Sequence, residues 1–562
     1  MSNGDPKPIK VRTRFAPSPT GRLHIGGVRT ALFNFLFAKK NNGDFILRIE
    51  DTDPERSNLK WEKEIIESLF WLGVKWDEGP LIVSQDQISD IKYKKYIGEY
   101  GPYRQSERLE IYAQYLEKLL KDGKAYFCFC SKEELETQRQ YQLSIGQAPR
   151  YNGKCWDLPE STVKKYLAEG RPSIIRFKVL SKKVIFKDLI RGQVEFDSSL
   201  FGDISIARNL AGLKKSVSSN LLSGGTLLPL YNFAVVIDDF EMKISHVIRA
   251  EEHLSNTPKQ ILIQEALGFP QLEYAHVPLI LGPDRSKLSK RHGATAVSDF
   301  KKTGYLPEAL INFMVFLGWN PGGDREIFSM ASLIKEFSLE KVQKGGAIFN
   351  IKKLNWINGF YIRQKSLDKL TELCSPYLIE KKLVTPTPQP TKAKDFSSLE
   401  LTPVYLVEKT GERTDFNLIK KIVSVYQERL TTLSEISELT DFFFKDKLEY
   451  NKELLRWKPP VSRLEMSDKE VKISLDKLEK ILSKIKEEEF TKENLEKILI
   501  PEAEKISKSF QPTLVTGDRG YLLWPFRVAL TGKEASAGPF EIAEILGKEK
   551  VLRRTKEAKK LL

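Results

Sequence analysis

The chain has 562 residues, of which 41% are hydrophobic and 29% charged, a composition typical of a globular protein with several domains. Lysine and arginine number 90 against 75 aspartate and glutamate, so the net charge of +15 favours polyanionic partners, nucleic acid first. The sequence shows no secretory signal and no apolar run of bilayer length, so we expect no membrane-spanning segment. Four cysteines are too few for a disulfide framework, so we expect a cytoplasmic protein.

Residues 8–106 alternate between strand-like and helix-like patterns. Apolar spacing predicts, in chain order, a strand at 9–15, a helix at 28–36, a strand at 45–49 and a helix at 61–72. This alternation indicates a parallel sheet, whose ligands bind beyond the carboxyl ends of the strands.

The alternation breaks at 107–230, which we interpret as an α+β insertion carrying three of the four cysteines. It returns in three runs that we interpret as strands of the same sheet, at 233–237, 244–248 and 277–281. After about residue 370 the pattern becomes helical and charge-rich, as at 475–488 and 540–562. The proline-rich segment 385–391 is expected to be an exposed, extended connector.

The loop between the first strand and the first helix has the features of a phosphate-binding site. Gly26 and Gly27 leave the helix start without side chains, so a flat ligand can approach the backbone. A helix N-terminus offers free N–H groups to phosphate, and His24 can donate a further hydrogen bond. The alternative is that His24 merely caps the helix. Neither a GxGxxG nor a Walker A spacing occurs, which argues against ordinary dinucleotide or P-loop binding.

A second cluster, Lys287-Leu-Ser-Lys-Arg291, follows the last predicted strand of the sheet. Two lysines and an arginine around a small serine suit the developing charge of a pyrophosphate group. Alone, such a cluster is more often a solvated basic turn, and its position downstream of His24-Ile-Gly-Gly27 favours the functional interpretation.

These two segments resemble the paired ATP-binding signatures of class I aminoacyl-tRNA synthetases. The resemblance narrows to bacterial-type glutamyl-tRNA synthetases through a series of ordered stretches: 13–21, 48–53, 101–108, 231–239, 247–252, 356–363, 530–532 and 540–548. It therefore covers nearly the whole chain, and the ordered series is far more specific than any one motif.

The resemblance implies an α/β Rossmann-like catalytic domain split by an α+β insertion and followed by an α-helical anticodon-binding domain. The implied parts are the first half of the catalytic domain (8–106), the acceptor-end-binding insertion (107–230), the second half (231–281), a stem-contact region with the Lys287–Arg291 loop (282–370) and the anticodon-binding domain (371–562).

The implied activity is that of a glutamate–tRNA ligase. Such an enzyme activates glutamate with Mg²⁺-bound ATP and transfers it to the 3′ end of tRNA(Glu), releasing AMP and pyrophosphate. Positions that match the ATP side are Thr20, His24, Gly26, Lys287 and Lys290, with His24, Lys287 and Lys290 as catalytic residues. We expect tRNA(Glu), glutamate and ATP as partners, no membrane, and a monomer.

Positions that match the family's glutamate-binding residues are Arg14, Ala16, Ser18, Glu50, Tyr231 and Arg249. The chemistry agrees, because a substrate carboxylate pairs best with a guanidinium, from Arg14 or Arg249. Glu50, at the end of its strand, can take the substrate ammonium. On residue type alone, Arg249 is more often a surface or ion-pairing arginine.

Two further assignments rest on the resemblance. Cys128, Cys130, Cys155 and Asp157 match the place of a zinc site in some relatives, and the alternative is a set of free, half-buried thiols. Arg429 aligns with an arginine that inspects the third anticodon base, and the alternative is a phosphate-binding or solvated arginine.

The chain departs from the family pattern at 82–100 and 209–226, which are extra segments, and at 371–460, which matches loosely. Three rivals remain in view. Glutaminyl-tRNA synthetases are disfavoured because the C-terminal third has a helical pattern, and the short relative that glutamylates a tRNA base lacks this half. A tRNA-binding protein without catalysis is disfavoured by the intact His24, Gly26, Lys287 and Lys290.

Overall fold

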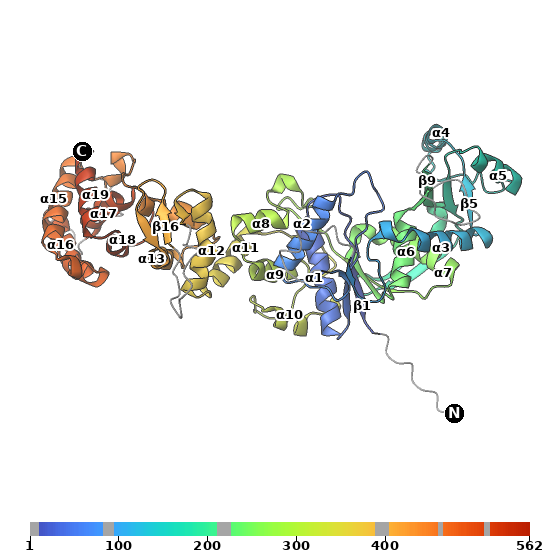
Figure 1. The fold of residues 1–562 in the computed structure, drawn as a ribbon, viewed down its shortest axis with the longest axis horizontal. Helices are drawn as coiled ribbons and strands as arrows, with labels where there is room; N and C mark the ends of the chain where they lie inside the picture. The colour runs from blue at the N-terminus through green and yellow to red at the C-terminus, as the bar shows by residue number, and fades with distance from the viewer. Residues whose placement is uncertain (1–9, 82–94, 211–225, 388–403, 459–464, 511–517) are drawn as a thin grey trace, which may run out of the picture. The chain divides into compact units, whose positions relative to one another are not determined.

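The computed structural model describes residues 10–81, 95–210, 226–387, 404–458, 465–510 and 518–562 (Figure 1). The extra segments predicted at 82–100 and 209–226 lie for the most part outside these residues. The chain forms two compact units, each considered separately below: Met1–Lys301 with Pro307–Ile357, and Lys302–Leu306 with Asn358–Leu562.

The first unit begins with the predicted strand, helix and strand. β1 (Arg12–Phe15) and β2 (Asp44–Leu47) pair in parallel, with Arg12 opposite Asp44, and α1 (Ile25–Lys40) packs against both strands. Most of α1 is buried, because Val28, Leu32 and Leu36 recur at helical spacing among other apolar residues. The predicted second helix is α2 (Leu59–Trp71). These predictions are confirmed.

The sheet continues with strands from later in the chain. β11 (His246–Ala250) lies beside β1, where the Ser245 N–H donates to the Arg12 carbonyl at 3.0 Å. β11 pairs in parallel with β12 (Glu273–Val277), and β12 with β7 (Lys183–Asp188), whose antiparallel partner is β8 (Gly192–Asp197). A short ladder joins β13 (Ile280–Leu281) to β14 (Ala347–Ile348).

Two sequence predictions in this region are wrong. Residues 233–237, expected as a strand, lie within the helix α6 (Tyr231–Glu241), where Phe233 to Ile237 are all buried. An unbroken apolar run indicates that a segment is buried on every side. It does not distinguish a buried helix from a buried strand, because neither has a polar face. The predicted insertion 107–230 is also not separate throughout, because it supplies β7 and β8 to the catalytic sheet.

The rest of the insertion forms its own four-stranded sheet, in the order β10-β9-β6-β5. Its strands are β5 (Ala125–Cys128), β6 (Ile174–Phe177), β9 (Ile204–Leu210) and β10 (Thr226–Pro229). Figure 1 shows α4 (Lys132–Ser144) and α5 (Glu160–Ala168) flanking this sheet. α3 (Leu109–Lys121) leads into it and packs against α6 and α7 (Thr257–Leu267).

The remainder of the first unit is helical. Its helices are most of α8 (Val297–Thr303), α9 (Pro307–Val315), α10 (Met330–Glu336) and the start of α11 (Ile351–Arg363). α9 and α10 pack against α1, so they support the helix that follows the His24 loop.

The second unit is mainly helical, as predicted. Its helices are the rest of α11, α12 (Leu367–Glu380), α13 (Phe416–Tyr426), α14 (Glu435–Thr440), α15 (Asp468–Lys484), α16 (Lys492–Phe510), α17 (Gly520–Thr531), α18 (Pro539–Leu546) and α19 (Lys548–Lys560). A three-stranded sheet of β15 (Val384–Pro386), β16 (Val404–Val407) and β17 (Arg413–Asp415) joins them. Thr385 and Pro386 therefore belong to a strand and not to the expected connector, while 388–391 lie outside the described residues.

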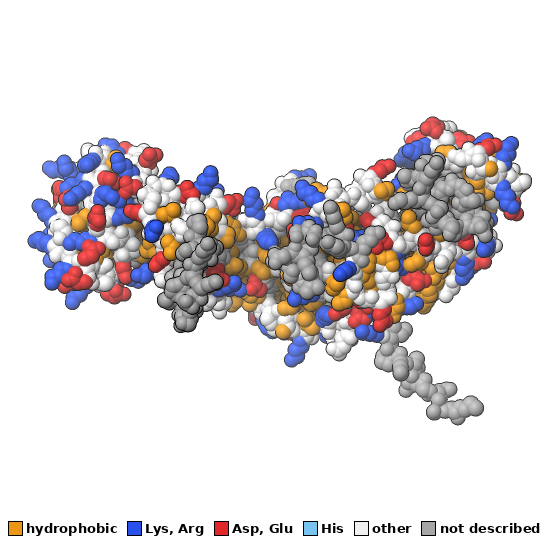
Figure 2. Space-filling view, in the orientation of Figure 1, with side chains coloured by type: hydrophobic (Ala, Val, Ile, Leu, Met, Phe, Trp, Pro, Cys, Tyr) orange, Lys and Arg blue, Asp and Glu red, His pale blue; other side chains and the backbone are white. Residues whose placement is uncertain are grey.

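Charged side chains of both signs cover the helices of the second unit. Figure 2 shows lysine and arginine interspersed with aspartate and glutamate over this surface. Several are paired, including Lys477 with Glu502 at 2.9 Å and Lys559 with Glu479 at 2.7 Å. Among the described residues, no helix has both the length and the apolar character needed to cross a bilayer.

Candidate active site

A cleft of about 1140 Å³ opens where β1, β2 and β11 end. Its walls come from the loops after these strands, the start of α1, the start of α6 and the segment 287–296. It brings together the predicted residues Arg14, Ala16, Ser18, Thr20, His24, Gly26, Glu50, Tyr231, Arg249 and Lys287. Lys290 begins a short 3-10 turn, and its side chain lies outside the part of the chain that the structure describes.

Backbone hydrogen bonds join the His24 segment to residues 295–297, which follow the Lys287–Arg291 loop. The Ile25 N–H donates to the Thr295 carbonyl and the Val297 N–H to the Leu23 carbonyl, both at 2.9 Å. His24 and Ala296 form an antiparallel bridge between these bonds. The loop with Lys287 is therefore tied to the start of α1 although the two segments are far apart in sequence.

The start of α1 is arranged as the sequence predicts for ligand binding. His24 is the N-cap residue, but its side chain makes no capping hydrogen bond, so the capping alternative is wrong. A Cβ atom at Gly26 would lie only 3.2 Å from His24 Nδ1, so a side chain there would crowd the imidazole. Desolvation by the cleft walls, aided by Lys287 and opposed by Glu252, lowers the pKa of His24. The neutral imidazole is therefore favoured near pH 7.

Arg249, at the end of β11, has one nitrogen without a partner. Its Nε donates to His276 Nε2 at 3.1 Å and its Nη2 to Thr257 Oγ1 at 2.8 Å. Its Nη1 is buried and makes no hydrogen bond. A buried donor without a partner costs about 1–3 kcal/mol, which an anionic ligand in the cleft would recover.

Arg14 and Glu50 belong to a buried network of charges. Arg14 donates to both carboxylate oxygens of Asp239, at 3.0 and 3.2 Å, and Arg48 donates to Asp239 at 2.7 Å and to Glu50 at 3.0 Å. Burial raises the pKa of Glu50, with Arg48 and Arg14 opposing the shift. The pKa of Asp239 is lowered: burial alone would raise it, but the positive charges of Arg14 and Arg48 outweigh that effect.

The sequence reasoning assigned no role to the acids of α6. Asp239 fixes Arg14, and Asp238 accepts hydrogen bonds from Gln105 at 2.8 Å and Arg108 at 2.7 Å. The sequence did contain a signal for these two acids. They stand side by side at the end of an apolar run, where acids are expected to be buried and therefore paired with other groups.

Glu252 is a second residue that sequence reasoning missed. Its carboxylate pairs with Lys287 Nζ at 2.5 Å, and both side chains are half exposed in the cleft. Its neighbour His253 lies 3.3 Å from the Tyr231 hydroxyl. In the sequence, the one indication that these residues belong to the site was their position directly after a predicted strand of the sheet.

Comparisons with known proteins agree with this geometry. A family model for the catalytic domain of class I tRNA synthetases (E and Q) matches residues 10–356, and a model for an anticodon binding domain matches 369–559. Glutamate–tRNA ligase 1 of Caldicellulosiruptor saccharolyticus is 47% identical over 97% of this chain and 98% of its own length. The glutamate–tRNA ligase of Carboxydothermus hydrogenoformans is 44% identical, with coverage of 97% and 98%.

Solved structures give the same result. The glutamate tRNA ligase of Elizabethkingia meningosepticum, in complex with its amino acid, matches with a TM-score of 0.75 and 33% identity, covering 98% of this chain and 99% of its own. The synthetase of Elizabethkingia anophelis matches with a TM-score of 0.74 at the same identity. The chain belongs to the glutamate–tRNA ligases, a family of class I tRNA synthetases.

The predicted metal site is placed only in part. Cys128, Cys130 and Cys155 bring their Sγ atoms within 4.8 Å of one another in the insertion. Asp157, the expected fourth ligand, is exposed and lies outside this cluster. Residues 154–157 form a turn that buries Cys155 and leaves Asp157 exposed, so the structure gives no support for Asp157 as a ligand.

Tyr151 occupies the place expected for the fourth ligand. Its hydroxyl lies 3.4 Å from Cys128 Sγ and 3.5 Å from Cys130 Sγ, and it accepts a hydrogen bond from the Cys155 N–H at 3.0 Å. Burial alone would raise the pKa of the Cys128 thiol, but its hydrogen bonds with Tyr151 and Arg176 outweigh this effect and hold that pKa below its usual value. Three sulfur atoms and one oxygen therefore converge.

Arg429 lies in the second unit, just after α13, and is exposed. Its Nη1 donates to the Ser536 carbonyl at 2.9 Å, in the segment before α18. The bond orients the guanidinium toward this loop without burying it, so other donors of the side chain stay accessible to a ligand.

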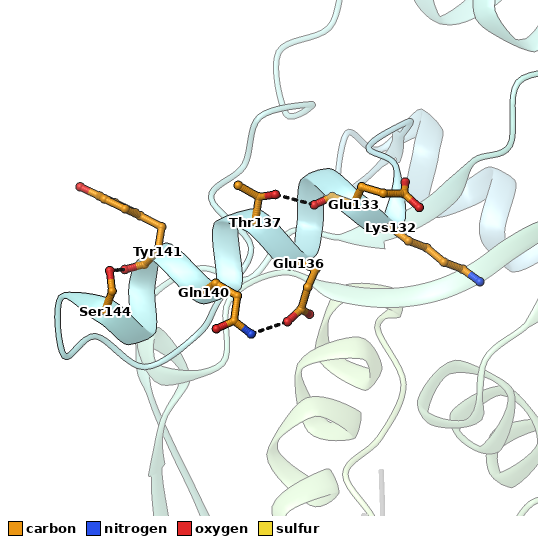
Figure 3. A pocket seen from close by; sticks show the side chains of 7 residues that line it. All are labelled: Lys132, Glu133, Glu136, Thr137, Gln140, Tyr141 and Ser144. Carbon is orange, nitrogen blue, oxygen red and sulfur yellow. Dashed lines mark hydrogen bonds between the residues drawn. The ribbon is translucent and has the colours of Figure 1, made fainter.

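A further hollow lies along α4, whose residues are all at least partly exposed (Figure 3). Its polar groups pair within the helix, with Thr137 donating to the Glu133 carbonyl at 2.9 Å and Gln140 to Glu136 at 2.6 Å. No group comparable to Arg249 Nη1 faces this hollow, and we assign it no ligand.

Proposed function

We propose that the chain joins glutamate to tRNA(Glu) in two steps, both carried out in the cleft at the ends of β1, β2 and β11. In the first step the α-carboxylate of glutamate attacks the α-phosphorus of ATP, which gives glutamyl-adenylate and pyrophosphate. In the second, the terminal ribose hydroxyl of the tRNA attacks the activated carbonyl and releases AMP. The protein positions groups and balances charge, so no nucleophilic side chain is required.

The glutamate half of the site supports this proposal most directly. The buried Arg249 Nη1 has no partner, and a guanidinium N–H is the donor that best suits a carboxylate. Glu50 lines the same cleft and can accept the substrate ammonium, while Asp239 holds Arg14 in place. Arg249 Nη1 is the single observation on which the choice of an anionic amino acid rests.

The ATP half is supported by the two signature segments, which line the same cleft. The open start of α1, with no side chain at Gly26, fits a nucleotide phosphate chain, and the neutral His24 can donate to a phosphate oxygen. Lys287 would leave Glu252 for the pyrophosphate charge as the first step proceeds. Mg²⁺ would arrive with ATP and neutralise part of its phosphate charge.

For zinc, we propose a structural site in the insertion held by Cys128, Cys130, Cys155 and the hydroxyl of Tyr151. The convergence of three thiols fits the preference of Zn²⁺ for sulfur ligands in a four-coordinate set. Bound metal would fasten the turn that carries Cys155 to the end of β5.

We also propose that the second unit reads the anticodon and that the chain acts in the cytoplasm as a monomer. The test of the main proposal is charging of tRNA(Glu) transcript with radiolabelled glutamate and ATP. Glutamate attached to the 3′ end is the expected product. A chain that binds tRNA(Glu) without charging it would refute the proposal and favour a regulatory protein.

A further inference from the structure

The further inference concerns how Arg249 keeps its free nitrogen in the cleft. Nε and Nη2 are each bound by one side chain, His276 from β12 and Thr257 from the start of α7. The guanidinium also lies against the ring of Tyr274, 5.8 Å from its centroid. Because these contacts engage one edge of the planar group, through Nε and Nη2, and one of its faces, they fix its orientation and leave Nη1 as the remaining donor nitrogen.

His276 can accept the Arg249 hydrogen bond only if its Nε2 carries no proton. Its other ring nitrogen, Nδ1, lies 2.6 Å from Asp188 Oδ2, and its backbone N–H donates to the same oxygen at 3.1 Å. A carboxylate is an acceptor, so Nδ1 carries the proton and Nε2 is left with a lone pair. Asp188 thereby sets the tautomer of His276.

Asp188 is itself held by the backbone. Its Oδ1 accepts from the N–H groups of Ile190 at 2.9 Å and Arg191 at 2.7 Å, in the turn after β7. Asp188 and His276 are fully buried. A buried carboxylate that accepts four N–H hydrogen bonds stays ionised and cannot rotate. Asp188 therefore keeps His276 in the tautomer that carries its proton on Nδ1.

We propose that Asp188, His276 and Thr257 are positioning residues that hold Arg249 with Nη1 toward the substrate carboxylate. None of the three lines the cleft, so they act through Arg249 and not on the substrate. The strand β7 that carries Asp188 comes from the insertion, which gives the insertion a part in amino-acid binding as well as its own sheet. This inference rests on the proposed function of the cleft.

The test compares His276→Leu with His276→Gln in ATP–pyrophosphate exchange with tRNA present. Leucine removes the acceptor, whereas the glutamine amide oxygen can replace Nε2. We expect His276→Leu to raise the KM for glutamate roughly 10- to 100-fold, as losses of orienting partners do at metal sites, while the KM for ATP stays within about two-fold. His276→Gln should recover most of the loss.

A double variant separates positioning from general packing. If His276 acts through Arg249, then His276→Leu adds little to Arg249→Ala, and the two effects on the glutamate KM are not additive. The matched control is His246→Leu, a histidine at the opposite end of β11 that lies outside the cleft and should leave both KM values unchanged. Thr257→Val, which keeps the side-chain shape, provides a second test if His276→Leu does not fold.

The outcomes are distinct. A wild type that gives no exchange with glutamate overturns the proposed function and this inference with it. A normal wild type and a damaged Arg249→Ala, together with unchanged glutamate KM values for His276→Leu and Thr257→Val, overturn the positioning role alone. Equal increases in both KM values, or full additivity with Arg249→Ala, would also overturn it, because they would mark His276 as a packing residue.

Discussion

At the scale of single residues, the groups that line the cleft differ in how fully their polar atoms are paired. Arg14 is held by Asp239 and Glu50 by Arg48 through buried bonds that are expensive to break. Lys287 is held only by an exposed ion pair with Glu252, which is worth no more than about 1 kcal/mol. Fixed residues therefore shape the amino-acid side, and Lys287 can change partner during the reaction.

The ATP side gives the first prediction. His24→Ala and Lys287→Ala should each slow adenylate formation by roughly two orders of magnitude, because a lost donor to developing charge costs about 3 kcal/mol. Affinity for tRNA should stay nearly intact. Single-turnover activation measures the rate, with Lys183→Ala as the control, since Lys183 has a similar exposed ion pair on β7, with Glu195 at 2.7 Å. Unchanged activation in both variants would show that the ATP site lies elsewhere.

A half-buried histidine near the amino-acid side, His253, predicts how stability depends on pH. Burial, with Arg249 assisting, lowers the pKa of His253 to about 4, below the value of about 6.5 in an unfolded chain. The unfolded state therefore binds more protons between these values, so this contribution to stability is complete above about pH 6.5 and declines toward pH 4.

Thermal unfolding of the first unit at pH 7.5 and at pH 5 tests this dependence. One proton accounts for at most about 1.4 kcal/mol per pH unit, so His253→Gln should lose less stability than the wild type on acidification. An equal loss in the wild type and in His253→Gln would contradict the assigned pKa shift.

At the scale of elements, the sequence predicted those parts whose signals are local. The strand, helix and strand of β1, α1 and β2 follow from apolar spacing and from the loop between them. The helix at 231–241 was mistaken for a strand because full burial removes the polar face that marks a helix. β7 was not recognised as a strand of the catalytic sheet, because pairing with β12 joins residues far apart in sequence.

The same limit applies to the site. Residues of the cleft were predicted because the segments that carry them resemble motifs of glutamyl-tRNA synthetases. Asp239, Glu252, His276 and Tyr151 were missed because their roles exist only through contacts with distant parts of the chain. Asp157 was chosen because it matches the fourth ligand position in some relatives, whereas the turn around Cys155 leaves it exposed to solvent.

The insertion gives a prediction about metal. Purified protein should contain close to one zinc per chain, and Cys130→Ser should abolish binding because three thiolates form most of the ligand set. Tyr151→Phe should weaken it, whereas Asp157→Ala, the control, should keep the wild-type content. Elemental analysis after dialysis against a chelator decides the matter, and a metal-free wild type would refute the proposed site.

At the scale of the whole molecule, the second unit should add selectivity among tRNAs to the chemistry of the first. Glutamate anticodons end in C and glutamine anticodons in G. The exposed Arg429, oriented by the Ser536 carbonyl, can accommodate cytosine and exclude the larger guanine. We therefore predict that the wild type charges glutamate tRNA and largely ignores glutamine tRNA.

Charging both transcripts with the wild type and with Arg429→Gln tests this selectivity. The variant should narrow the gap between the two tRNAs, while Arg519→Gln, which alters an exposed arginine paired with Glu504, should not. A uniform loss for both tRNAs would instead indicate a phosphate contact. A wild type that charges both transcripts equally would contradict the assignment of Arg429.

The central claim, that the cleft activates glutamate, is tested most directly by ATP–pyrophosphate exchange. The measurement compares glutamate with glutamine, each with and without tRNA(Glu). Because Arg249 Nη1 offers a charged donor to a carboxylate, exchange with glutamate in the presence of tRNA should exceed that with glutamine by roughly a hundred-fold or more. Equal exchange with both amino acids, or none with either, would contradict the account.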